Sequence, residues 1–212
     1  TSEVWAAVNE TWMLLSDVLK NPVPETELPE TLATIRQQSA LVRGALHGTM
    51  LRNDIYDFCR LGTFVERIAS TARIIDVKYF SLLPSPAFVG SRMDRVQWET
   101  ILRSVSAHRS FRWAEGADYT AANIANFLIL DRRMPRSLAF CASQMVNNLA
   151  YLAEEYGEES ESLNKAKALQ ARLKGRDISS IFDEGLHEFL GSVMADAAVL
   201  GTQIEQDYRF LK

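Results

Sequence analysis

Residues 61–78, with the sequence LGTFVERIASTARIIDVK, decide the fold class of this 212-residue chain. Apolar side chains recur there at steps of three and four residues, which is the spacing of one face of an α-helix. They are Leu61, Val65, Ile68, Ala72 and Ile75. No proline interrupts the stretch, and apolar and polar residues do not alternate as they would in a strand. The segment is therefore expected to form a long helix with one buried face.

The rest of the chain repeats this pattern. Its prolines fall at residues 22–29, at residues 84–86 and at Pro135, so three long tracts between and after them are free to be helical. Helices are expected over about residues 2–20, 31–51, 54–83, 94–113, 120–130, 135–157, 162–174 and 177–204. Asp94 with Gln97 predicts a capping box, Thr120 predicts a helix cap, and Pro135 is expected in the first turn of its helix. The sequence predicts an all-α bundle of six to eight helices.

The bundle is expected to be a single domain over residues 1–212, with a core built from the apolar helix faces. Four large side chains lie on such faces, two in the first expected helix and two in the last, and all four are expected to be mostly buried. They are Trp5, Trp12, Phe189 and Leu200.

Composition excludes several classes of protein. Hydrophobic residues make up 47% and charged residues 24%, which is typical of a globular protein and excludes a disordered chain. A net charge of −4 gives no basis for a nucleic-acid or membrane-surface binder, and no stretch is long and apolar enough to predict a membrane span. Two cysteines are too few for a disulfide framework, which favours reduced thiols and a cytoplasmic location.

No motif predicts a cofactor or a metal. The chain lacks a glycine-rich phosphate loop, a His-Glu-x-x-His motif and a Cys-x-x-Cys motif. Glu184 and His187 form one Glu-x-x-His pair, but di-iron bundles use two such pairs and the second is missing. We therefore expect neither a metal site nor a cofactor.

A charged line beside the apolar face of residues 61–78 is the main candidate site. At about 100° per residue, Glu66, Arg73 and Asp76 fall within about 40° of one line that borders the core, where charges must be paired or bind a ligand. Arginines of other expected helices are the leading partners. The candidate binding residues are Glu66, Arg73, Asp76, Arg109, Arg112 and Arg136. A salt-bridged helix interface and a functional polar cleft both remain open.

Several motifs together carry a resemblance to a known family. They lie at residues 43–51, at 61–67 (LGTFVER) with 71–76, at 79–86, at 102–107, at 127–137 and at 182–189. This combination resembles the alpha-E family of bacterial helical proteins. The resemblance implies that the chain is the C-terminal two-thirds of a longer family domain, because an earlier copy of the 61–73 motif is missing. Thr63 and Ala69 also stand where the family often has an arginine and an acidic residue.

The resemblance also implies a function. Members are typically encoded beside, or fused to, ATP-grasp-type ligases and transglutaminase-like proteins, which implies a role in making or modifying peptides. The expected function is a helical partner of an ATP-grasp-type peptide ligase without catalysis of its own, and a separate chain supplying the missing N-terminal segment is a further expected partner. The resemblance assigns no catalytic residues. One alternative is an enzyme acting on a carboxylate- or phosphate-bearing substrate through Glu66, Arg73 and Asp76, and another is a purely structural scaffold.

Overall fold

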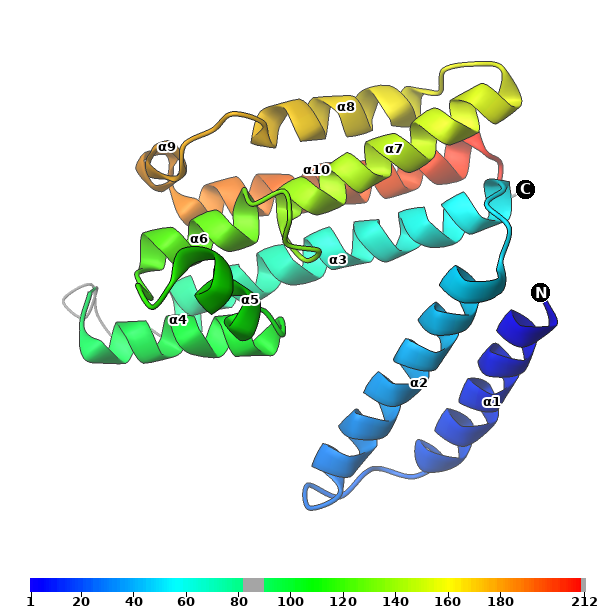
Figure 1. Cartoon of the computed structure of the whole chain (residues 1–212), viewed down its shortest axis with the longest axis horizontal. Coiled ribbons are helices and arrows are strands. Elements are labelled where there is room, and N and C mark those ends of the chain that lie inside the picture. The colour runs from blue at the N-terminus through cyan, green and yellow to red at the C-terminus, as the bar shows by residue number, and fades with distance from the viewer. Residues whose placement is uncertain (82–89, 211–212) are drawn as a thin grey trace. The chain divides into compact units, whose positions relative to one another are not determined.

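The computed structural model of the chain describes residues 1–81 and 90–210, with side chains for residues 1–78 and 90–210. These residues form ten helices and no strand (Figure 1). The helices are α1 (Ser2–Val18), α2 (Leu28–Thr49), α3 (Asp54–Ser81), α4 (Arg92–Ser104), α5 (His108–Glu115), α6 (Ala121–Ile129), α7 (Leu138–Tyr156), α8 (Glu161–Leu173), α9 (Ile178–Glu184) and α10 (Leu186–Asp207). The all-α prediction is confirmed, and the predicted six to eight helices are a slight miscount.

Two turns explain the additional helices. The helix expected over residues 94–113 is divided into α4 and α5 at Ser106, and the last expected helix is divided into α9 and α10 at Gly185. Ser106 has a φ of 56° and Gly185 a φ of 103°. Neither backbone conformation can continue a right-handed helix, so each residue ends the helix that precedes it.

Helix caps differ from the predictions at two places. The hydroxyl of Ser91 accepts a hydrogen bond from the backbone N–H of Asp94 at 3.2 Å, so Ser91 and not Asp94 caps α4. Ser137 caps α7 by accepting from the N–H of Phe140 at 3.0 Å, which leaves Pro135 before the helix rather than in its first turn. Thr120 caps α6 as predicted.

Helix packing divides the chain into two compact units, described separately here: the N-terminal hairpin (Thr1–Tyr56) and the C-terminal bundle, which begins at Asp57. In the hairpin, α1 and α2 run antiparallel (Figure 1). Thr11 Oγ1 donates to Gln38 Oε1 at 3.0 Å between them. The expectation of a single domain over residues 1–212 stays a prediction.

The predicted burial of the two N-terminal tryptophans is wrong. Trp5 and Trp12 are each 71% exposed. The side of α1 that packs on α2 carries Ala7, which is 5% exposed, and Thr11, which bonds across the interface. The tryptophans lie about 100° around the helix from that side, because each follows a contact residue by one position.

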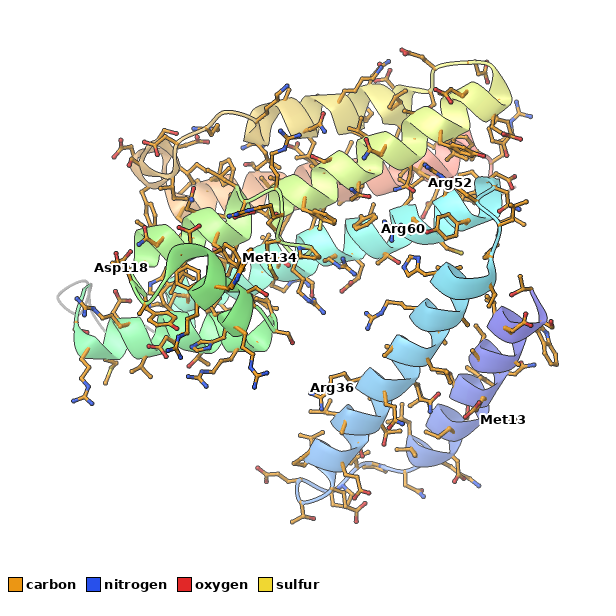
Figure 2. All side chains as sticks on the ribbon, viewed as in Figure 1. Met13, Arg36, Arg52, Arg60, Asp118 and Met134 are labelled. Carbon is orange, nitrogen blue, oxygen red and sulfur yellow. The ribbon has the colours of Figure 1, made fainter. Side chains whose placement is uncertain are left out.

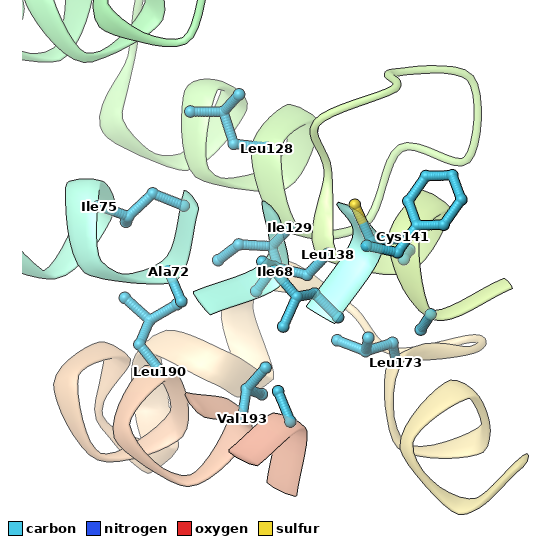
Figure 3. Close-up of a cluster of buried hydrophobic side chains, with 14 of the residues drawn as sticks. Ile68, Ala72, Ile75, Leu128, Ile129, Leu138, Cys141, Leu173, Leu190 and Val193 are labelled. Atoms are coloured by element: carbon cyan, nitrogen blue, oxygen red, sulfur yellow. The ribbon is translucent and has the colours of Figure 1, made fainter. Parts of the chain in front are cut away.

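The core of the C-terminal bundle lies between α3, α6, α7, α8 and α10. Figure 3 shows Ile68 and Ile75 of α3 close to apolar side chains of α6 and α10, among them Ile129 and Val193. Phe189 is fully buried and Leu200 is 1% exposed, so both predictions for the last helix are confirmed. Among the helices that the structure describes, none is long and apolar enough to cross a bilayer.

Candidate functional site

A pocket of about 390 Å³ opens on the C-terminal bundle beside α5. Helix α5, helix α6 and the segment between α6 and α7 line it, with Arg109, Ser110, Trp113, Ala114, Phe127, Arg133, Met134 and Pro135. This volume is in the range of small-molecule and side-chain binding sites.

The pocket has an apolar floor and a rim that reaches solvent. Phe127 and Met134 are 3% and 6% exposed and belong to the core (Met134 is labelled in Figure 2). Trp113 is 85% exposed, and Arg109 on the same helix is exposed as well. Such a combination can hold an apolar group on the floor and an anionic group at the rim.

Arg133 on the rim is held in place by its own segment. Its guanidinium donates to both carboxylate oxygens of Asp131, at 3.2 Å from Nε and 2.6 Å from Nη2. Its backbone N–H donates to the same carboxylate at 2.6 Å. Partial burial alone would raise the pKa of Asp131, but these hydrogen bonds outweigh it and lower that pKa. Among the described residues, no carboxylate forms an ion pair with Arg109. Of the two pocket arginines, Arg109 is therefore the one more available to a ligand.

An arginine of α3 supports the pocket from behind. Arg67 Nη1 donates to the backbone oxygen of Pro135 at 3.0 Å. The guanidinium of Arg67 also lies 5.4 Å from the centre of the Phe64 ring, and that of Arg60 lies 4.6 Å from it. Because Phe64 is 1% exposed, this arrangement fixes Arg67 against a rigid part of the core. Arg67 therefore positions one wall of the pocket.

Glu66 and Arg136, two of the predicted binding residues, lie around a common neighbour. Burial raises the pKa of the Cys141 thiol to about 12, while Arg67 and Arg136 act to lower it and Glu66 acts to raise it. Both predicted residues thus act electrostatically on Cys141, which forms part of the core in Figure 3. Glu66 is exposed and Arg136 half-buried.

The predicted network of Glu66, Arg73 and Asp76 does not form. Glu66 and Arg73 are exposed, and across the described residues no hydrogen bond or ion pair joins them to each other or to Asp76. The reason is geometric, because the apolar stripe of α3 takes the core and turns the charged line towards solvent. In the part of the chain that the structure describes, these three residues also form no ion pair with the predicted arginines, which are Arg109, Arg112 and Arg136.

Asp76 instead pairs with a histidine of α10. Its Oδ1 lies 2.7 Å from His187 Nδ1, and the two side chains are half-buried. Glu184, the other member of the Glu-x-x-His pair, bonds Arg176 at 2.7 Å. In the part of the chain that the structure describes, no three acidic, histidine or cysteine side chains gather as metal ligands.

A buried ion pair of α3 and α4 was not predicted from the sequence. Lys78 and Asp94 are 2% and 4% exposed, and Nζ lies 2.5 Å from Oδ1. Lys78 also donates to Gln97 Oε1 at 2.9 Å. Because the Lys78 ammonium donates to two side chains of α4, the pair links α3 to α4 and is not a ligand site.

The sequence analysis identified Arg109 but missed the rest of the pocket. Arg112 lies one turn from Arg109 on α5 and is exposed, outside the pocket lining. A usable signal was present at Trp113, a large apolar residue about 200° around α5 from the buried Phe111 and so outside the buried side of that helix. The Asp131–Arg133 turn gave no such signal, because an acid and a base two residues apart are common on surfaces.

Comparison with known proteins gives one match. A family model named Alpha-E, described as a predicted alpha-helical domain with a conserved ER motif, matches residues 1–209. Glu66-Arg67 is the one place where the sequence has these two residues in succession. The match covers essentially the whole chain, so the expected restriction to the C-terminal two-thirds of the family is slightly off. No curated protein and no solved structure matches.

Proposed function

We propose that this chain, which belongs to the Alpha-E family, is a helical partner of an ATP-grasp-type peptide ligase in bacterial peptide synthesis or modification and has no catalysis of its own. In this function the pocket beside α5 holds a segment of the peptide or of the ligase. The proposed partner, or a transglutaminase-like protein in its place, follows from the family resemblance.

The chemistry of the pocket lining carries the proposal. Its charged groups are Arg109 and Arg133, and guanidinium groups stay protonated at any working pH. They can bind a carboxylate or a phosphate, but they cannot accept a proton as a general base. The indole of Trp113 and the apolar floor add affinity for an apolar side chain. The lining is suited to holding a ligand rather than to transforming it.

The Glu66-Arg67 pair, which matches the ER motif in the family description, supports the same site. Arg67, its arginine, bonds the Pro135 carbonyl at one wall of the pocket. In a binding protein, an arginine that donates to a backbone carbonyl can hold a wall of the binding site in place. Arg67→Lys would keep the charge but lose the planar group that lies against Phe64.

The test combines the purified chain with an ATP-grasp-type ligase from the same bacterium. We expect the chain to lower the KM of the ligase for its peptide, and the chain alone to consume no ATP. Trp113→Ala with Arg109→Ala is expected to remove at least about 90% of this effect, since each contact contributes about 1–2 kcal/mol. Arg95→Ala, which removes an equally exposed arginine from neighbouring α4, is the matched control and should change nothing. Failure of the ligase to respond to the wild-type chain would contradict the proposal.

A second candidate function is favoured by the pair of Asp76 and His187. A carboxylate bonded to one imidazole nitrogen is the usual arrangement that orients a histidine as a general base. In this alternative the chain is an enzyme for a carboxylate- or phosphate-bearing substrate, with Arg73 one turn before Asp76 and Glu66 about two turns further back on α3. If the purified chain alone turns over a peptide or a nucleotide, and Glu66→Gln or Asp76→Asn abolishes turnover without unfolding it, the partner function is wrong.

A further inference from the structure

The N-terminal hairpin has one strongly apolar face that its own two helices do not cover. On α1, Trp5, Val8, Trp12, Leu15 and Leu19 follow one another at steps of three and four residues. This is the spacing of the contact seam in helical bundles. Trp5, Trp12 and Leu19 are 71%, 71% and 52% exposed, so this seam is formed but not occupied within the hairpin.

The second helix extends the same face. On α1 the seam lies one residue, or about 100°, after the positions that contact α2, such as Ala7 and Thr11. On α2 the residues one position after its contact residues Thr31 and Gln38 are Leu32 and Ser39. Because the two helices are antiparallel, equal offsets in the same sequence direction lead to the same side of the hairpin.

Charge is distributed unequally between the two sides of the hairpin. The acidic residues of α1, namely Glu3, Glu10 and Asp17, lie about 180° from the tryptophan seam. The cations of α2 next to the apolar face are Arg36 and Arg43, which are both exposed and lie at its outer edge. The apolar face is thus bordered by positive charge alone.

From this pattern we propose that the face binds the same face of a second copy of the chain, giving an antiparallel four-helix bundle with two-fold symmetry. The proposal is independent of the ligase function. With the two-fold axis parallel to the helices, α1 of each copy lies against α2 of the other and every helix keeps its height along the axis. Alternative two-fold arrangements would set the arginine edges of the two copies against each other.

The two helices match each other in this arrangement. The bond between Thr11 and Gln38 fixes their relative height, and it places Arg36 about one residue from the level of Trp12. Trp5 and Arg43 each lie seven residues further along, in opposite directions, so they are level with each other as well. The two indoles of each copy can therefore stack with the two guanidinium groups of its partner.

The small side chain of Ser39 adds to this match. It lies on the apolar face of α2, close to the level of Trp12, and is exposed. A serine between larger neighbours leaves room for an indole from the opposing helix, as alternation of large and small residues does in packed interfaces. If this face were always in contact with water, it would need neither the two exposed indoles nor the space above Ser39.

The area of the face is sufficient for a stable dimer. At 71% exposure the two tryptophans leave roughly 300 Å² uncovered, if a whole aromatic side chain offers about 200–250 Å². Val8, Leu19, Leu28 and Leu32, each about half exposed, add roughly 200 Å². Two copies would then bury about 1,000 Å² of apolar surface and, at about 65% apolar area, about 1,500 Å² in total. Stable interfaces bury about 1,200–2,000 Å².

Sedimentation equilibrium of the whole purified chain tests the proposal. The wild type should have twice the 23.9 kDa mass of one chain at micromolar concentrations. Trp12→Glu should weaken the dimer by about 30-fold or more, as expected for a central aromatic contact. Arg36→Ala should weaken it by about 3–10-fold and Arg36→Lys by nearly as much, because lysine keeps the charge but does not stack. Circular dichroism of each variant separates dissociation from unfolding.

Met13→Glu is the matched control. Met13 is 65% exposed and directly follows Trp12, but it lies about 100° further around α1, outside the apolar face (Figure 2). This variant should remain a dimer. The proposal is overturned if the wild type is a monomer at 100-fold higher concentration, in which case another part of the chain or another protein covers the face. It is also overturned if Met13→Glu and Trp12→Glu have the same effect, or if Trp12→Glu leaves the dimer intact.

Discussion

The N-terminal hairpin and the C-terminal bundle use the same apolar spacing with opposite results. In the apolar stripe of α10, Phe189 and Leu200 are at most 1% exposed. In the corresponding stripe of α1, Trp5 and Trp12 are each 71% exposed. Both sequences satisfy the rule for an amphipathic helix equally well. An apolar stripe therefore predicts that a helix has an interface. Which surface covers the stripe depends on the other helices that are available to pack on it.

The largest expected effect is the loss of a core aromatic from the bundle. Phe189→Ala should lower the free energy of unfolding by about 3–5 kcal/mol, because the ring is fully buried and its removal leaves a cavity. Trp12→Ala in the hairpin removes a larger side chain from a mostly exposed position. Within a single copy it should therefore cost less than about 1 kcal/mol. Urea denaturation of both variants at a concentration that keeps the chain monomeric compares them, and equal losses would contradict the distinction between the two stripes.

The second prediction concerns the buried ion pair of α3 and α4. Lys78→Ala should destabilise the bundle by about 3 kcal/mol, because the carboxylate of Asp94 would stay buried with its main cation removed. The loss should be at the low end of such cases, since the backbone N–H of Gly90 still donates to Asp94 at 2.8 Å. The double variant Lys78→Met with Asp94→Leu should recover part of the loss in a denaturation experiment. No recovery would show that burial of the unpaired charge is not the cause.

The third prediction addresses the turn that holds Arg133 at the pocket. Asp131→Asn should cost about 1 kcal/mol or less near pH 7, because the Arg133 side chain of the pair is 67% exposed to solvent. The pKa of Asp131 is lowered in the folded chain, so its contribution is present above the unfolded pKa and is lost as the pH falls through the folded one. The difference in stability between wild type and Asp131→Asn should therefore shrink in acid. A difference that grows on acidification would contradict the assigned cause.

Much of the fold could be predicted from spacing alone, and the reasons for the misses are local. Helices over most of the described chain follow from apolar periodicity and proline placement. The breaks at Ser106 and Gly185 depend on positive φ values, which a serine rarely adopts and a glycine only sometimes signals. The burial of Lys78 depends on Asp94 meeting it from a different helix, and helical periodicity contains no information about that neighbour.

The candidate site was harder to predict than the fold. Arg109 was identified as an arginine of another expected helix that could pair with the charged line, and it does line the pocket. Trp113, Arg133 and Met134 come together only through the packing of α5 against α6 and the following segment. The charged line of Glu66 and Arg73 was assigned to the border of the core from helix angles, but a rotation of a few tens of degrees separates a border position from an exposed one.

The smallest expected effect therefore belongs to Arg73. The two interpretations of the charged line predict different outcomes for Arg73→Ala, a loss of about 3–5 kcal/mol for a buried network and almost no loss for a binding cleft. Arg73 is exposed and, within the described residues, contacts no carboxylate, so the loss should be below about 0.5 kcal/mol. Arg67→Ala, six residues earlier on α3, is the informative counterpart because it removes the bond to Pro135 and should cost about 1–2 kcal/mol. Thermal denaturation compares the loss of stability in the two variants. A larger loss for Arg73→Ala than for Arg67→Ala would contradict the assignment of Arg73 to the solvent and would favour the buried network.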